Sequence, residues 1–142
     1  MKLVQLIYIS SAIKELSDDE LDNILESSIR HNQQQQVTGM LLYSDGNFMQ
    51  VIEGEESKIN ETYERICEDT RHRNIILVNQ ETISEREFES WPMGFRRLSL
   101  RDAEENPTYA PFFINGIDAA KMVTQPGLAK GLLKLFNKGL LC

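Results

Sequence analysis

Residues 37–54 read VTGMLLYSDGNFMQVIEG, and this stretch decides the fold of the chain. The apolar runs Val37–Tyr43 and Phe48–Ile52 are typical of strands, and the Ser-Asp-Gly-Asn sequence between them is typical of a tight turn. We therefore expect a β-hairpin that closes at Glu53-Gly54. One residue of this hairpin is unusual, because Gln50 places an amide in the middle of an apolar strand.

A strand and a helix are predicted before the hairpin. The apolar run Leu3–Ile9 indicates a first strand, which contains Tyr8. Ser17 and Glu20 have the spacing of a capping box, so a helix begins there. At about 100° per residue, the polar side chain of Asn32 falls inside the apolar stripe of that helix.

A helix and two strands are predicted after the hairpin. Helical periodicity runs from Glu55 to about Asp69, and Ile75–Val78 is typical of a strand. Apolar residues alternate from Trp91 to Phe95 in a last strand, where Pro92 indicates an edge or a strand start. The order βαββαβ with a final strand predicts an α+β, ferredoxin-like fold, with both helices on one face of an antiparallel sheet.

The remainder of the chain, residues 99–142, is expected to form a helical extension of a domain at residues 1–98. Two weaker helical patterns, at Ile114–Val123 and Leu128–Leu141, are separated by Gln125-Pro126-Gly127. The second pattern contains so many apolar residues that its apolar face must be buried against another surface. It would pack either on the sheet face that the first two helices leave bare or on another chain.

Composition restricts the classes of function. A chain of 142 residues with 41% hydrophobic content fits one domain, and a net charge of −7 argues against binding to nucleic acid or to an anionic membrane. No apolar run approaches the roughly 18 residues of a spanning helix. Cys67 and Cys142 have no partner spacing, so we expect reduced thiols, no disulfide scaffold and no metal site. These features predict a cytoplasmic protein.

Polar residues gather where the fold predicts a core. Because side chains alternate along a strand, Tyr8 and Gln50 can meet in the cleft between the two helices. A tyrosine and a glutamine in a core often satisfy each other, which is the simplest explanation of this pair. However, Asn32 joins them from one helix, and Arg65 and Asp69 join them from the other. Polar groups from several elements favour a bound, planar ligand with polar edges.

Sequence motifs for catalysis are missing, so we do not expect an enzyme. There is no glycine-rich dinucleotide or phosphate loop, no zinc-protease motif and no nucleophile elbow. One alternative is a small ferredoxin-like enzyme of the acylphosphatase kind, but Ile9–Ile13 offers no glycine for a phosphate-binding turn. Another is a metabolite-binding regulatory module, which would have no reason to pair Tyr8 with Gln50.

Several short motifs occur in an order that resembles a known family. They are LIYIS at residues 6–10, His31-Asn32 ahead of VTGMLLY, FMQVIEG at residues 48–54, YERI at residues 63–66, DTRH at residues 69–72 and FESWPMGF at residues 88–95. Together they resemble a BLUF domain, the blue-light sensor that uses flavin, in its short, single-domain form. The resemblance covers about residues 1–98.

The resemblance implies a chromophore, a site and an output. FAD would be held non-covalently between the two helices, and light would change hydrogen bonds in a relay formed by Tyr8, Gln50, Trp91 and Met93. The output would be a change in contacts with a signalling protein or within a homo-oligomer. The residues expected at the cofactor are Tyr8, Ile24, Ser28, His31, Asn32, Gln50, Arg65, Ile66, Asp69, Arg71 and His72.

Overall fold

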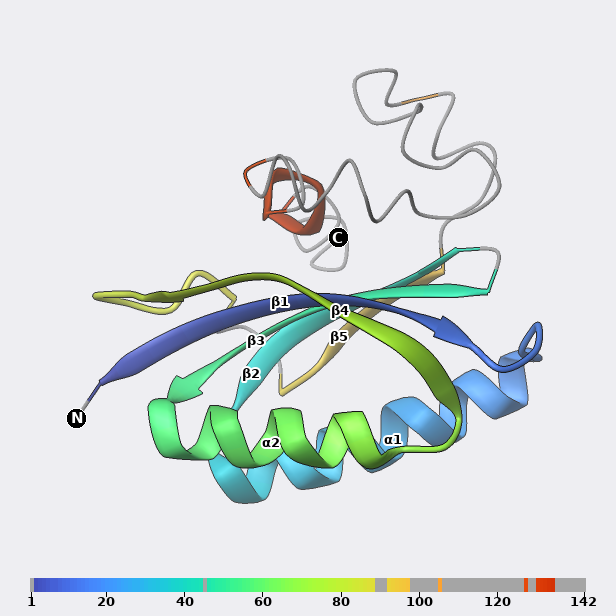
Figure 1. The fold of residues 1–142 in the computed structure, drawn as a ribbon, viewed down its shortest axis with the longest axis horizontal. Coiled ribbons are helices and arrows are strands. Elements are labelled where there is room, and N and C mark those ends of the chain that lie inside the picture. The colour runs from blue at the N-terminus through green and yellow to red at the C-terminus, as the bar shows by residue number, and fades with distance from the viewer. Residues whose placement is uncertain are drawn as a thin grey trace.

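The computed structural model describes residues 2–44, 46–88, 92–97, 105, 127 and 130–134. The elements follow the predicted order, as Figure 1 shows. Their bounds are β1 Leu3–Ala12, α1 Asp18–Gln35, β2 Thr38–Ser44, β3 Asn47–Glu55, α2 Glu56–Glu68, β4 His72–Thr82 and β5 Gly94–Arg97. The α+β prediction is therefore confirmed.

The five strands form one sheet in the order β4-β1-β3-β2-β5. The first four strands are antiparallel to their neighbours, as the ferredoxin-like pattern predicts. The last strand differs, because β5 lies parallel to β2 at the edge of the sheet. The expectation of a wholly antiparallel sheet was therefore wrong for β5. The order of elements along a chain does not tell which edge the last strand joins, and that edge decides its direction.

The hairpin of β2 and β3 has the predicted turn. Ser44 pairs with Asn47, and Gly46 has a φ of 83°, a conformation that favours glycine. A second glycine is required inside β2, because a Cβ atom on Gly39 would lie 2.0 Å from the carbonyl oxygen of Val51. The strand pair is packed so closely at this point that only glycine fits.

Both helices cover one face of the sheet (Figure 1). The capping box at Ser17 and Glu20 is present, so α1 begins where the sequence predicts. Buried side chains of the sheet, including Leu6, Leu41 and Ile52, form a core with Leu21 of α1 and Ile59 of α2. This core fixes the distance between the two helices and the sheet.

Several strand boundaries differ from the prediction, since β1 continues from Ile9 to Ala12 and β3 from Ile52 to Glu55. The strand expected at Ile75–Val78 extends over the whole of β4, and the last strand begins at Gly94 instead of near Trp91. Pro92 has no backbone N–H to donate, which is consistent with a strand that starts only after it. Trp91 lies outside the described residues.

The other face of the sheet has a core of its own. Ile7 and Val51 point away from the helices and are almost fully buried, and so are Leu132 and Leu133. Residues 130–134 are helical, and Figure 1 shows them in red on the side of the sheet opposite α1 and α2. Of the two predicted C-terminal helices, the first lies outside the described residues. In the described part of the second, the apolar residues Leu132 and Leu133 are fully buried.

In the described ranges, no helix is both long enough and apolar enough to cross a lipid bilayer.

Candidate functional site

A buried tyrosine–glutamine pair lies on the helix-facing side of the sheet. Tyr8 of β1 and Gln50 of β3 are register partners, and each is 4% exposed. The Tyr8 hydroxyl donates a hydrogen bond to Oε1 of Gln50. The Nε2 atom of Gln50 faces the sulfur of Met93 at 3.3 Å. Because a thioether can only accept, the amide nitrogen must be the end that points at Met93.

Burial keeps the Tyr8 hydroxyl of this pair protonated. Burial raises the pKa of the Tyr8 hydroxyl far above its usual value, and the negative charge of Asp69 raises it further. The hydroxyl therefore keeps its proton at neutral pH and acts as the donor to Gln50. The amide of Gln50 accepts at one end and donates at the other, so it links Tyr8 to Met93.

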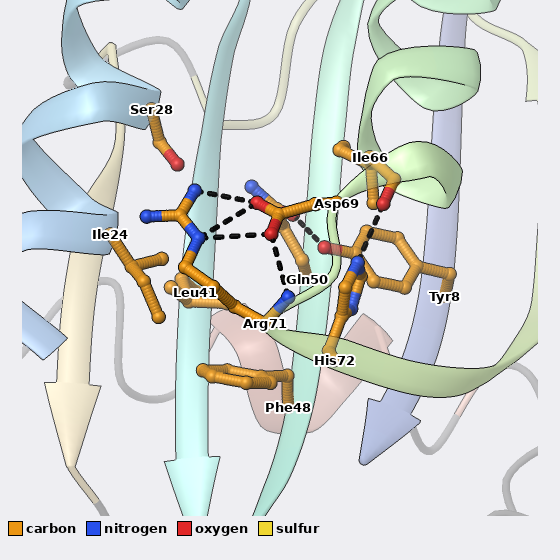
Figure 2. Close-up of a pocket in the computed structure, with 10 residues that line it drawn as sticks. All are labelled: Tyr8, Ile24, Ser28, Leu41, Phe48, Gln50, Ile66, Asp69, Arg71 and His72. Carbon is orange, nitrogen blue, oxygen red and sulfur yellow. Dashed lines mark hydrogen bonds and ion pairs between the residues drawn. The ribbon is translucent and has the colours of Figure 1, made fainter. Parts of the chain in front are cut away.

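A groove between α1 and α2 opens above this pair (Figure 2). It has two parts, which overlap because they share Ser28, Gln50, Ile66, Asp69 and Arg71. The first part is further lined by Tyr8, Ile24, Leu41, Phe48 and His72. The second is further lined by Ser27, His31, Asn32, Thr62 and Arg65. The groove is thus apolar at one end and polar at the other.

An ion pair lies in the groove, between Ser28 of α1 and Ile66 of α2 (Figure 2). The Nε atom of Arg71 donates to both carboxylate oxygens of Asp69, at 2.9 and 3.0 Å. Burial alone would raise the pKa of the Asp69 carboxyl, but the hydrogen bonds and positive charge of Arg71 lower it below its usual value. In return, Asp69 raises the pKa of Arg71. Both groups are therefore charged at neutral pH.

His31 connects the two helices at the polar end of the groove. Arg65 donates to its Nδ1 atom, and its Nε2 atom lies 3.1 Å from the hydroxyl of Thr62. Because arginine can only donate, Nδ1 is the acceptor and Nε2 carries the proton. Burial lowers the pKa of His31, and the positive charge of Arg65 lowers it further. His31 is therefore a neutral bridge between α1 and α2.

His72 fixes the opposite end of the groove. Its Nε2 atom donates to the carbonyl oxygen of Ile66 at 2.6 Å, and its Nδ1 atom lies 2.7 Å from the hydroxyl of Ser10. The ring is also edge-on to Tyr8 and Phe48, with centroid distances of 6.3 Å in both cases. His72 thus joins the end of α2 to β1 beside the tyrosine.

Asn32 joins helix α1 to the segment that precedes β5. It is 2% exposed, and its amide nitrogen donates to the carbonyl oxygen of Pro92 at 2.8 Å. Met93, the next residue, accepts from Gln50. The start of β5 is therefore held both by the groove and by α1.

The structure brings the predicted cofactor residues together. All eleven of them line one part of the groove or both. Of the predicted relay, Met93 lies at Gln50, whereas Trp91 falls outside the described residues. The predicted cofactor residues did not include Ser27, Leu41, Phe48 and Thr62, which also line the groove. The alternation of β2 and β3 was the available signal, since Phe48 shares a face with Gln50, and Leu41 is the register partner of Gln50.

The groove has the chemistry that a flavin requires. A flat, conjugated ring system needs apolar walls, which Ile24, Leu41 and Ile66 provide. Its heteroatom edge needs amide or guanidinium groups, which are present at the polar end. An anionic tail needs a cation near the rim, and Arg71 is about two-fifths exposed. The residues present fit the cofactor that the sequence implied.

Comparisons with known proteins agree with this chemistry. Residues 3–94 match the family model described as BLUF, sensors of blue-light using FAD. The chain is 36% identical over 88 residues to the photoactivated adenylate cyclase subunit beta of Euglena gracilis, a match that covers 62% of this chain and 10% of that protein. It is 30% identical over 103 residues to the blue light- and temperature-regulated antirepressor BluF of Escherichia coli (strain K12), covering 72% of this chain and 26% of that protein.

The fold agrees as well. The dark-state structure of BlrB, a BLUF protein, has a TM-score of 0.67 to this chain at 31% identity, and the match covers 78% of this chain and 83% of that one. The chain spans about a tenth of the length of the cyclase subunit that it matches, so the similarity concerns the domain between β1 and β5.

Proposed function

This chain belongs to the BLUF family, the sensors of blue-light using FAD, and we propose that its groove between α1 and α2 holds FAD and that Tyr8, Gln50 and Met93 register the light. The domain is a flavin-based sensor and not an enzyme. The cyclase activity in the name of the Euglena relative is not carried over, because the chain matches about 10% of that protein. The acylphosphatase-like and metabolite-binding alternatives have no support.

One observation carries the proposal, namely the hydrogen-bonded series of Tyr8, Gln50 and Met93 at the floor of the groove. When bound, the flavin would supply the absorption of blue light and, once excited, a strong oxidant. The Tyr8 hydroxyl is the buried donor at that place, and its hydrogen bond directs its proton toward the Gln50 amide oxygen. A turn of the Gln50 amide would exchange donor and acceptor ends, which changes the hydrogen bonding without breaking a covalent bond.

The other groove residues would bind and orient the cofactor. We propose that Asn32 and Gln50 hydrogen-bond the edge of the ring system, that Ile24 and Ile66 pack on its faces, and that Arg65 and Arg71 face its polar and anionic parts. Support comes from the lining of the groove, in which apolar and hydrogen-bonding groups are separated. Ser28, His31, Asp69 and His72 would fix the positions of these groups.

FAD is the flavin that we propose, and it would be bound non-covalently. Cys67 is exposed on α2 and does not line the groove, so no thiol of the described residues is placed to form an adduct. The test is to purify the holoprotein, release the chromophore with acid and identify it by chromatography. Complete release of FAD is expected. Release of FMN or riboflavin would show that the bound flavin is not FAD. A folded, colourless protein that takes up no added flavin would refute the function.

The output would be a change in protein contacts. The names of two relatives, a cyclase subunit and an antirepressor, support an output through another domain or protein. We propose that residues 1–98 sense light and that residues 99–142 transmit the signal to a protein partner or to a second copy of the chain. Size-exclusion chromatography in darkness and under blue light tests this output. An elution volume that is unchanged by light, alone and with cell extract, would count against it.

A further inference from the structure

Strands β1 and β3 carry a second buried polar pair, on the sheet face opposite the groove. Gln5 and Glu53 are register partners, three residues from Tyr8 and Gln50 along their strands. Because three is an odd number of residues, the second pair points to the other face. Both side chains are 0% exposed, and Nε2 of Gln5 donates to Oε2 of Glu53 at 2.7 Å.

The Glu53 carboxylate holds the backbone of the connection between β4 and β5. Its Oε1 atom accepts the N–H groups of Glu87 at 3.0 Å and Phe88 at 2.7 Å. Hydrogen bonds from N–H groups to a carboxylate are stronger than those to a neutral acceptor. Phe88 is 1% exposed, so its N–H group would be buried and unpaired without Glu53.

Arg86 holds the same connection from its other side. Its guanidinium donates to the backbone carbonyl of Glu53 at 2.8 Å, to the hydroxyl of Thr38 at 2.9 Å and to the carbonyl of Gln36 at 2.7 Å. Residues 86–88 are therefore attached to β2, to β3 and to the end of α1. Glu87 extends this attachment to the C-terminal helical segment, because its carboxylate pairs with Lys130 at 3.1 Å and with Lys134 at 3.2 Å.

The connection meets β3 a second time, at Met93. There the contact is the hydrogen bond from Gln50 to a thioether sulfur, at 3.3 Å. A thioether is a weak acceptor, whereas a buried carboxylate is a strong one. One strand thus holds one connection at two points, strongly at residues 87–88 and weakly at Met93. A change in the Gln50 amide acts directly on the weak point alone.

From this arrangement we infer that Glu53 is a positioning residue that keeps residues 83–88 fixed in darkness and in light, so that the rearrangement started at Gln50 is confined to the chain after Phe88. The inference rests on the proposed function and adds a residue on the far side of the sheet. Glu53 would act through the backbone that it holds, because its side chain faces away from the groove.

The test is backbone amide hydrogen exchange, measured by NMR on the flavin-loaded full chain in darkness and under blue light. In the wild-type protein, the amides of Glu87 and Phe88 are expected to exchange at the same rate in both conditions, and those of Met93–Arg97 to change by about tenfold, which corresponds to about 1.4 kcal/mol. In Glu53→Met, the light-induced absorption change is expected to remain, and the light-dependent change in exchange is expected to spread to residues 83–88.

Two variants separate positioning from general stability. Glu53→Gln keeps an acceptor oxygen for residues 87–88. Its new amide nitrogen can donate to Oε1 of Gln5, which has no hydrogen-bond partner among the described residues, once the Gln5 amide turns over so that its oxygen and not its nitrogen faces residue 53. In this variant the light-dependent change in exchange is expected to stay confined to the chain after Phe88, as in the wild-type protein. Val51→Ala removes volume from the same face of the same strand but no acceptor. It is expected to speed exchange in both conditions without changing which amides respond to light.

The outcomes distinguish this inference from the function on which it rests. Faster exchange at Glu87 and Phe88 on illumination of the wild-type protein, together with a normal absorption change, would overturn the inference alone. The same conclusion would follow if Val51→Ala spread the response as Glu53→Met does. If Glu53→Met does not fold, the wild-type protein and Glu53→Gln still show whether the amides of residues 87–88 exchange at the same rate in darkness and in light. A wild-type holoprotein without any light-induced absorption change would refute the proposed function instead.

Discussion

Replacement of Tyr8 by phenylalanine tests the buried relay most directly. The change removes only the hydroxyl, and the Tyr8 ring stays packed between β1 and Tyr63 of α2, whose ring centroid lies 5.9 Å away. It leaves Oε1 of Gln50, a residue that is 4% exposed, without the donor that the structure shows. A buried acceptor that loses its partner costs about 1–3 kcal/mol, so we expect Tyr8→Phe to lower the free energy of unfolding by about 2 kcal/mol.

The complementary change, Gln50→Leu, leaves the Tyr8 hydroxyl without its acceptor and should cost a similar amount. The double variant leaves no unpaired group in the pair, so its cost should be smaller than the sum of the two single costs. The expected interaction energy is about 1–2 kcal/mol, within the usual range for residues in direct contact. Both single variants should keep the flavin, because packing in the groove is retained, and both should lose the reversible red shift under blue light.

The assay is urea unfolding of the four proteins at one pH and one flavin concentration. The flavin affinity of each variant is measured separately, so that the contribution of ligand binding to stability can be subtracted. Absorption spectra before and after blue light give the second readout. An interaction energy below about 0.5 kcal/mol would show that the two side chains are not coupled. A normal photocycle in Tyr8→Phe would refute the relay even if the stability result agreed.

Three further predictions concern other parts of the structure. Asn32→Ala should raise the dissociation constant for flavin about tenfold, the equivalent of about 1.4 kcal/mol, because Asn32 is buried beside the groove. The same change at its exposed neighbour, Gln33→Ala, should leave the constant unchanged. Fluorescence titration with flavin measures both dissociation constants. The pKa of His31 is lowered in the folded protein, so as the pH falls the unfolded chain binds a proton at His31 before the folded protein does. The free energy of unfolding should therefore fall as the pH drops below about 6.5. Unfolding curves at several pH values should show a smaller loss in His31→Asn. Leu132→Ala should lower the free energy of unfolding by about 2–3 kcal/mol, because Leu132 is 0% exposed; an effect below about 0.5 kcal/mol would contradict its place on the sheet.

The sequence predicted those features that local patterns determine. The capping box placed the start of α1, and the two-residue period of β1 and β3 placed Tyr8 and Gln50 on one face. Such patterns repeat within a few residues, so a single element contains the whole signal. The lining of the groove followed from the same periods, together with the motifs of the family.

Features that depend on distant partners were not predictable in this way. The direction of β5 depends on which sheet edge it joins, and Glu-Gly at residues 53–54 resembles the polar end of a hairpin. In the structure β3 continues to Glu55, and Glu53 is 0% exposed. Its partners lie 34 and 35 residues further along the chain, in residues 83–88, which form neither a helix nor a strand. No local pattern marks a carboxylate whose partners are backbone N–H groups so far away.

The alternation of β3 explains how one strand can serve two purposes without interference. Gln50 faces the groove, where a weak contact to Met93 can be exchanged at small cost. Glu53 faces the opposite core, where burial of a charge is expensive unless several donors compensate it. The side-chain amide of Gln5 and the backbone N–H groups of Glu87 and Phe88 are such donors, and removal of any one leaves the buried carboxylate with fewer hydrogen bonds. The difference in strength between the two attachments therefore follows from their chemistry, and it decides which end of the β4–β5 connection can respond when the Gln50 amide changes.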